Sequence, residues 1–426
     1  MNKRKKKGNK MVKYLENKKA SLILITVCFL TYTIIGLTRN AYNAAIVGII
    51  KEGYFTKTDA GIIATSFNIT YCISQIAGSY FVDRVSPFKL IVFAAVVTIL
   101  ANIAMSLNPT YWMIFIARGI CGIAQFGVWP ALFRILSEYI NKCYRNTWRY
   151  ILPLGISFGT VISYLGAAII PNWRGLFTFS YTAMAIATIV FIITVIYAEK
   201  KAVVRVKENN DADTSVQIKK NTHKETGVLK LLSSTGAFFL VIPVLVKTLI
   251  NSGISSWMPT MIMESYGVSP SFSSTMSTIS TCANFAAVLW VMIFYPRIFK
   301  LQTTASGMFF VFMLPFLIGT AIYIGIIPVL WIVIFITVIN TLSGAIHQFY
   351  TVEFPKAYTK FNKAGMMAGL INAIATVGSI ISSWLWGVMA DSYNWNVIIW
   401  TWVIMALVAA CCSFAATPLW KKTIRN

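Results

Sequence analysis

The sequence predicts an all-α integral membrane protein with twelve transmembrane helices arranged as two pseudo-symmetric six-helix bundles. Three observations support this fold class. The 426 residues are 57% hydrophobic and only 12% charged, which excludes an ordinary soluble domain. The apolar runs reach the ~20 residues that a helix needs to cross a ~30 Å hydrocarbon core. Basic residues fill alternate gaps between these runs, which is typical of cytoplasmic loops.

The apolar runs are interpreted as helices because backbone N–H and C=O groups in lipid must bond within the protein. In chain order, the spans of the first half are Leu22–Ile49, Asp59–Val82, Lys89–Leu107, Tyr111–Ile140, Thr147–Ile169 and Arg174–Tyr197. Those of the second half are Gly236–Tyr266, Phe272–Arg297, Ala305–Ile327, Val329–Glu353, Ala364–Val388 and Trp395–Ala416.

Lys and Arg cluster before the first span, after each even-numbered span and after the last one. In order, the clusters are residues 3–19; Arg84 and Lys89; Lys142, Arg145 and Arg149; residues 200–230; Arg297 and Lys300; Lys356, Lys360 and Lys363; and Lys421, Lys422 and Arg425. The other gaps hold only Lys51, Lys57 and Arg174. Short basic loops stay in the cytoplasm, so we expect a multi-pass protein of the plasma membrane with both termini inside.

The predicted spans divide six and six around one hydrophilic gap. The expected organisation is a basic cytoplasmic N-terminus (1–20), an N-terminal bundle (21–198), a cytoplasmic linker without periodicity (199–235), a C-terminal bundle (236–417) and a cytoplasmic C-terminus (418–426). The net charge of +24 is attributed to positive-inside loops and to attraction by anionic lipid headgroups, not to a nucleic-acid partner. The seven cysteines lack metal-ligand spacing, so neither a metal nor another cofactor is expected. A monomer is expected.

The two halves resemble each other in sequence. At one constant offset, Arg39 aligns with Asn251; at another, Arg118 aligns with Asn340 and Gln125 with His347. Duplicated six-helix units joined by a cytoplasmic loop are the architecture of secondary transporters, which hold substrate between the halves near the midplane.

The loop after the second span, Ser79–Lys89 with Asp83 and Arg84, resembles the Gly-x-x-x-Asp-Arg signature of the major facilitator superfamily. It departs at the glycine, which is replaced by Ser79. A related Gly387-x-x-x-Asp391 follows the eleventh span. The resemblance implies that Asp83, Arg84 and Asp391 take part in gating, the first two at the cytoplasmic side.

Within the superfamily, two anion-handling families are similar to this chain. Arg39-Asn40, Gln125-x-x-x-Trp129-Pro130 and the segment from Gly253 to Thr260 resemble the organophosphate:phosphate antiporters. Arg118-x-x-x-Gly122 with the later Pro130 resembles the anion:cation symporters.

The departures from these families bear on substrate and coupling. The antiporters' second arginine corresponds to Asn251, their lysine to Gln75 and their histidine to the region of Ile156 and Ser157. The symporters' proton-carrying acids correspond to Thr38 and Gln125. These differences count against phosphate esters as substrates and against proton coupling through those two positions.

Arg39 lies about thirteen residues before Glu52, hence roughly 20 Å below the outer end of its helix. Arginine at a helix centre costs about 2.5–3.5 kcal/mol on insertion scales. The usual compensation is a buried carboxylate, yet no Asp or Glu lies near the middle of any span. An internal arginine without an internal acid indicates a binding site for an anion, since guanidinium matches carboxylate and phosphate oxygens.

Polar faces on spans one, two, four, seven and ten complete the expected binding site, because the resemblance to the superfamily implies that these helices border a central cavity. The candidates are Arg39, Tyr42, Asn43, Gln75, Arg118, Gln125, Lys247, Asn251 and His347. Arg39 is expected to bind the anionic group and Arg118 to supply a second contact or to orient it. Alternatives stay open: Arg118 as a packing residue, Lys247 as a replacement for the missing arginine or a snorkelling side chain, and His347 as a bundle residue or a proton carrier.

The sequence therefore predicts a transporter of a small organic anion, such as a carboxylate, a sugar acid or a phosphorylated metabolite. Alternating access is expected, with exchange favoured over proton symport. A transport-inactive receptor that senses an anion and a multidrug or cation exporter are the alternatives. No nucleophile–base pair or phosphate-binding loop supports an enzyme. The substrate, the direction of transport and the counter-ion are not determined by the sequence.

Overall fold

Helices account for nearly all of the computed structural model, which describes residues 11–82, 84–107, 109–170, 172–206, 236–298, 301–358 and 364–425. The N-terminal half contains α1 Lys18–Lys51, α2 Lys57–Val82, α3 Pro87–Ser106, α4 Tyr111–Gln125, α5 Val128–Arg134, η1 Ile135–Tyr139, α6 Lys142–Ile151, α7 Leu154–Ile169 and α8 Trp173–Lys201. The C-terminal half contains η3 Ala237–Leu240, α10 Val241–Tyr266, α11 Pro270–Ile298, α12 Gln302–Tyr323, α13 Val329–Gln348, η4 Phe349–Glu353, α14 Phe354–Ala357, α15 Ala364–Ser392 and α16 Trp395–Arg425.

The predicted spans coincide with these helices. In the described part of the chain, nine helical stretches are long and apolar enough to cross a membrane, and the 16-residue α7 is a shorter apolar one. The remaining two predicted spans correspond to α2, of 26 residues, and α11, of 29 residues. The predicted twelve-helix membrane fold is thereby confirmed.

Some of the predicted spans are interrupted rather than continuous, and the fifth is divided between α6 and α7 at Leu152 and Pro153. The fourth is divided into α4, α5 and the π-helix η1, and Pro130 lies at the break, where it cannot donate a helical hydrogen bond to Phe126. The tenth changes from α13 into the π-helix η4. The interruptions of the fourth and tenth spans lie in corresponding helices of the two halves.

A short two-stranded sheet was not predicted. Strand β1, Met11–Tyr14, pairs antiparallel with β2, Val203–Val206, so that Met11 lies opposite Val206 and Tyr14 opposite Val203. The beginning of the supposed linker is therefore a strand that joins the two ends of the N-terminal half. The segment from 207 to 235 lies outside the described residues.

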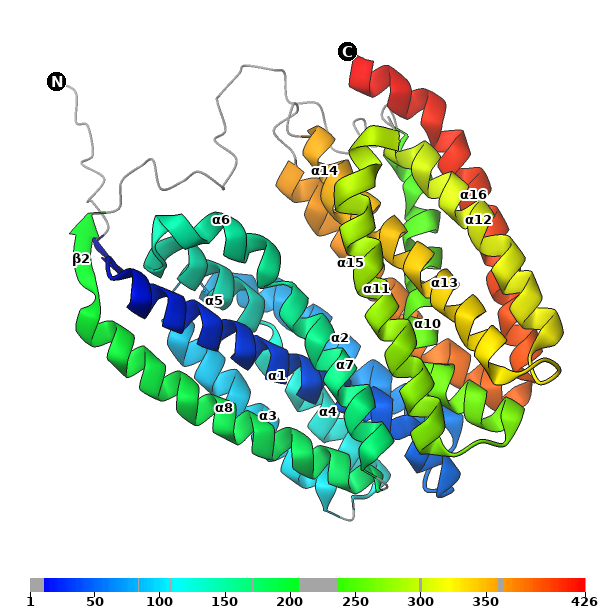
Figure 1. Cartoon of the computed structure of the whole chain (residues 1–426), viewed down its shortest axis with the longest axis horizontal. Helices are drawn as coiled ribbons and strands as arrows, with labels where there is room; N and C mark the ends of the chain where they lie inside the picture. The colour runs from blue at the N-terminus through cyan, green and yellow to red at the C-terminus, as the bar shows by residue number, and fades with distance from the viewer. Residues whose placement is uncertain are drawn as a thin grey trace.

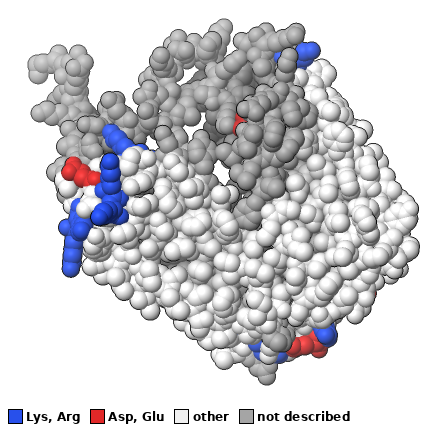
Figure 2. Space-filling view, in the orientation of Figure 1, with Lys and Arg blue, Asp and Glu red and all other residues white. Residues whose placement is uncertain are grey.

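The charged side chains gather at two ends of the described surface, with an uncharged belt between them (Figure 2). Large apolar side chains are exposed along this belt; Leu100, Ile186 and Ile404 are each more than 60% accessible. A soluble protein rarely exposes apolar side chains so extensively, whereas a lipid-facing surface requires them.

The two halves lie apart at the end that carries β2 and the last turns of α16, and they come together at the opposite end, here called the closed end (Figure 1). There α2 packs against α15, α7 against α11 and α1 against α10. The approach is close because it uses glycine: a Cβ atom on Gly61 would lie 2.5 Å from the carbonyl oxygen of Ser383, and one on Gly387 2.6 Å from that of Lys57. Small residues at such contacts let membrane helices meet backbone to backbone.

Candidate functional site

Arg39 of α1 is held by a short chain of hydrogen bonds. Its Nε donates to Oε1 of Gln125 at 3.1 Å, and the Gln125 amide nitrogen donates to Oγ1 of Thr98 at 3.2 Å. The second bond fixes the amide so that its oxygen faces the guanidinium. The structure thus brings together two residues from the predicted set, Arg39 and Gln125, that are far apart in sequence.

The guanidinium of Arg39 also lies over two aromatic rings. Its Cζ is 4.7 Å from the ring centroid of Tyr71 and 5.4 Å from that of Phe67, and these rings are stacked with an interplanar angle of 10°. The predicted Gln75 donates to the Tyr71 hydroxyl at 3.1 Å. Cation–π contacts orient an arginine without neutralising it. Tyr71 and Phe67 were missed in the sequence because aromatic residues are common in membrane helices.

Beyond its Nε, Arg39 has four N–H groups on its Nη atoms, and within the described ranges no protein acceptor bonds them. Among the described side chains, no carboxylate forms an ion pair with Arg39. Arg39 is half-buried, so its free N–H groups form a paired donor surface suited to a carboxylate or phosphate.

Arg118 of α4 is buried, with 3% of its surface accessible. Its Nη1 donates to the backbone carbonyl of Arg39 at 3.0 Å, and its Cζ lies 4.7 Å from the Phe67 ring centroid and 5.0 Å from that of Tyr42. The Tyr42 hydroxyl donates to the carbonyl of Ala60. Arg118 therefore ties α4 to the backbone of α1 at the residue that carries Arg39.

The C-terminal half has a neutral pair at the corresponding place. Asn251 of α10 donates to Oδ1 of Asn340 at 2.8 Å, and Asn340 donates to Oγ of Ser280 at 3.2 Å. The sequence repeat aligns Arg39 with Asn251 and Arg118 with Asn340. Arg118 contacts Arg39 within the N-terminal half, and Asn340 contacts Asn251 within the C-terminal half. The corresponding positions thus carry two cations in one half and two amides in the other; Arg118 bonds the Arg39 backbone, whereas Asn251 and Asn340 bond through their side chains.

A second polar pair lies on the same two helices of the C-terminal half. Nζ of Lys247 lies 2.8 Å from Nδ1 of His347, and Lys247 is only 6% accessible. His347 corresponds to Gln125 in the repeat. In each half, a basic side chain of the first span therefore contacts a side chain of the fourth: Arg39 contacts Gln125, and Lys247 contacts His347.

The other predicted residues are distributed more widely. Asn43 is half-buried on α1 and has no hydrogen bond among the described residues. Asp83 lies outside the described residues, and Arg84 is exposed in the turn after α2. Asp391 lies at the closed end, where it accepts hydrogen bonds from the backbone of Lys57 and Thr58.

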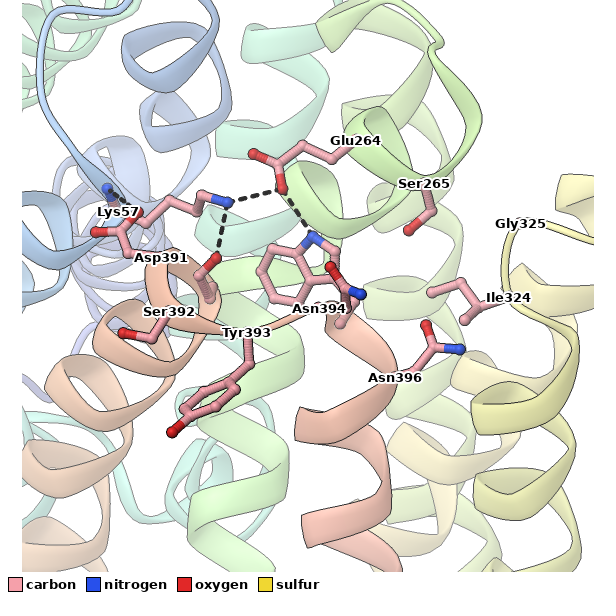
Figure 3. Close-up of a pocket in the computed structure, with 12 residues that line it drawn as sticks. Lys57, Glu264, Ser265, Ile324, Gly325, Asp391, Ser392, Tyr393, Asn394 and Asn396 are labelled. Carbon is pink, nitrogen blue, oxygen red and sulfur yellow. Dashed lines mark hydrogen bonds and ion pairs between the residues drawn. The ribbon is translucent and has the colours of Figure 1, made fainter.

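A pocket of about 510 Å³ opens at this closed end (Figure 3). Within it, Lys57 Nζ forms an ion pair with Glu264 Oε2 at 3.0 Å and donates to the carbonyl of Ala390 at 2.9 Å. Trp395 Nε1 donates to the same Glu264 oxygen at 2.8 Å. Side chains of both halves therefore line this pocket and join across it.

The profile described as the Major Facilitator Superfamily matches residues 28–362. A probable hexose phosphate transport protein of Chlamydia trachomatis is 30% identical over 150 residues, which are 34% of this chain and 33% of that protein. The glycerol-3-phosphate transporter of Bacillus subtilis is 21% identical over 392 residues, or 86% of each chain.

One solved structure shows how far the fold agrees. A bacterial homolog of the human lysosomal transporter Spinster, in an inward-facing and unoccupied conformation, superposes with a TM-score of 0.72 at 14% sequence identity. The match covers 96% of this chain and 99% of that one.

Proposed function

The chain belongs to the major facilitator superfamily and is a membrane transporter, not an enzyme, and we propose that it carries a small organic anion across the plasma membrane by alternating access. The substrate classes that fit are carboxylates, sugar acids and phosphorylated metabolites. Exchange of one anion for another is the proposed mode. The two relatives, whose names concern hexose phosphate and glycerol-3-phosphate, support an anionic cargo.

The unused donor surface of Arg39 carries this proposal. The side chain lies at mid-depth in α1, stacks on Tyr71 and presents its Nη atoms without a described protein acceptor. Every Asp and Glu of the described residues lies near a helix end or outside the helices. An unpaired internal cation is unfavourable in a bilayer, so an anion supplied from outside is the natural partner.

The uncharged residues at the corresponding positions of the C-terminal half, Asn251 and Asn340, support different roles for the two halves in binding. Arg39 binds the anionic group, while the amides of Asn251 and Asn340 provide a site for the uncharged remainder of the substrate. The C-terminal half lacks the second arginine of the organophosphate antiporters at Asn251. A single arginine favours anions of low charge, such as a monocarboxylate, over a phosphate dianion.

The arrangement of the halves supports an inward-facing state. The basic loops favour a cytoplasmic location for the end that carries β2 and the last turns of α16, and the halves meet at the opposite end (Figure 1). On this basis the closed end faces outward, and Arg39 is reached from the cytoplasm. Transport requires that the contacts at the closed end separate while the other ends of the halves approach.

Purified protein in liposomes tests the proposal. Vesicles loaded with lactate, succinate, gluconate, glucuronate, phosphate, glycerol-3-phosphate or glucose-6-phosphate are assayed for exchange with the same labelled compounds. We expect exchange of at least one of these anions, a loss of 100-fold or more in Arg39→Ala, and wild-type exchange in the control Arg174→Ala. Arg174 pairs with Glu52 within the N-terminal half, away from Arg39.

Two results would count against the proposal. Undiminished exchange by Arg39→Ala would remove the arginine from the binding site. Binding of an anion without flux through the wild-type protein would favour a receptor.

A further inference from the structure

The Lys247–His347 contact sets a limit on the charge of this pair. A fully protonated lysine and a fully protonated imidazole have only N–H donors to offer each other. Their nitrogens lie 2.8 Å apart, so one of the two must present a lone pair. The pair therefore carries at most one positive charge while the contact exists, one fewer than two separate cations would carry.

The N-terminal half has a similar pair whose acceptor is uncharged. There Arg39 donates to Gln125, whose amide oxygen accepts and cannot titrate in the physiological range. His347 takes the place of Gln125 in the repeat and contacts Lys247. An acceptor that does not titrate in one half is thus replaced in the other by an imidazole, which can bind a proton.

The surroundings contain no described partner that would fix the charge of the pair. Among the described side chains, the titratable groups on the elements packed against α10 and α13 are Lys18, Lys19, Cys28, Tyr32, Arg39, Tyr42 and Lys51 on α1, Cys282 on α11, Tyr323 on α12, Tyr350 and Glu353 on η4, Asp391 on α15, and Cys411, Cys412 and Lys421 on α16, besides Glu264 and Tyr266 on α10 itself. Glu264 is seventeen residues from Lys247, roughly 25 Å along the helix. Glu353 is the nearest carboxylate in sequence, about two turns beyond His347. No described ion pair joins an acid to Lys247.

We propose that Lys247 and His347 form one shared proton-binding site and that proton uptake there accompanies entry of the anion. This inference rests on the proposed function, because the anion on Arg39 supplies the negative charge that draws the proton in. With the proton bound, the pair offers the substrate a second cationic contact from the C-terminal half. The proton comes from water on the side of entry and returns to water on release. If one proton is bound with a dianion and none with a monoanion, each carries one net negative charge across, so their exchange moves no net charge.

Histidine spectroscopy tests the proton site without relying on transport. The chain has two histidines, and His223→Gln leaves His347 as the only one. Nitrogen-15 spectra of the imidazole in nanodiscs, recorded from pH 5 to pH 9, report on both ring nitrogens. We expect the titration of His347 to change when Lys247→Met removes its partner, since coupled groups titrate as a pair. Identical titrations in the two proteins would overturn the inference.

Transport tests the link to the anion. The variant His347→Gln keeps an acceptor for Lys247, as Gln125 does for Arg39, but removes the titrating ring. We expect it to retain measurable exchange of the preferred anion of the panel, at a rate below that of wild type because one partner of the proposed site is replaced. Its rate should not respond to a pH gradient that accelerates wild type about fivefold or more. Equal responses of wild type and variant would overturn the proton link.

The two experiments separate the two proposals. A coupled titration of His347 in a protein that exchanges none of the anions would defeat the proposed function and the transport link together, while leaving the shared proton site in place. Anion exchange that depends on Arg39, combined with an uncoupled His347, would leave the proposed function standing and reject the proton site.

Discussion

Asp391 of the C-terminal half caps α2 of the N-terminal half at Lys57. Its Oδ1 accepts from the backbone N–H of Lys57 at 3.2 Å and its Oδ2 from that of Thr58 at 2.6 Å. These are first-turn N–H groups, which have no partner inside their own helix, and a carboxylate is the side chain that the helix N-terminus favours. The closed end is therefore held in part by a helix cap that crosses between the halves.

Replacing Asp391 by Ala should weaken closure at this end. Loss of a helix cap costs about 0.5–2 kcal/mol, so the equilibrium between closed and open forms should shift by roughly 2- to 30-fold. Spin labels at the exposed positions Lys51 and Tyr393 would report the shift as a longer distance population.

The matched control is Asp59→Asn, because the Asp59 carboxylate bonds to Thr56 within the same half. The control removes an acid from the same helix end without breaking a contact between halves. Equal distance distributions for Asp391→Ala and wild type would show that the cross-half cap does not hold this end closed.

Replacing Tyr71 by Leu should weaken substrate binding. The ring lies 4.7 Å from the Arg39 guanidinium, and a cation–π contact is worth about 0.5–1 kcal/mol at exposed sites and about 2 when desolvated. The KM of the preferred anion should therefore rise about 2- to 30-fold, with a smaller change in kcat. Tyr71→Phe keeps the ring face, removes only the hydroxyl that Gln75 contacts, and serves as the control. A KM unchanged in Tyr71→Leu would mean that the stacking does not position Arg39.

Replacing Arg118 by Met should separate a positioning role from direct binding. Arg118 is buried, holds the Arg39 carbonyl through Nη1, and leaves its Nε without a hydrogen-bond partner. A buried charge with incomplete pairing contributes little net stability, so we expect a melting temperature within a few degrees of wild type. The transport rate of Arg118→Met should remain at least tenfold above that of Arg39→Met. If Arg118→Met instead lost as much transport activity as Arg39→Met and also had a raised KM, Arg118 would be shown to touch the substrate.

The spans were predictable because each depends on one helix alone. An apolar run of sufficient length must become a helix in lipid whatever its neighbours are, and α1, α3 and α8 accordingly lie where the sequence indicated. The interruption of the fourth span at Pro130 was less visible, because a proline kinks some membrane helices and is accommodated in others. Strand β2 was not predicted because an alternation of only four residues is too short to indicate a strand.

The contacts between helices were predictable only in part. The repeat aligned Arg39 with Asn251 and Arg118 with Asn340. The structure shows that Arg118 contacts Arg39 and that Asn251 contacts Asn340. No such alignment indicated that Tyr71 stacks on Arg39, or that Asp391 reaches the other half. Those contacts depend on helix rotation and crossing, which the order of residues along one helix does not encode.

The sequence by itself determined the twelve spans, the depth of Arg39 and the lack of an internal acid to match it. These follow from hydropathy and from the position of a charge along a single helix, which are local properties. Only the tertiary structure decided that Lys247 shares a hydrogen bond with His347 and that Asp391 joins the two halves. Both contacts join residues from different helices, and they exist because packing fixes how those helices are rotated and how far they are shifted relative to one another.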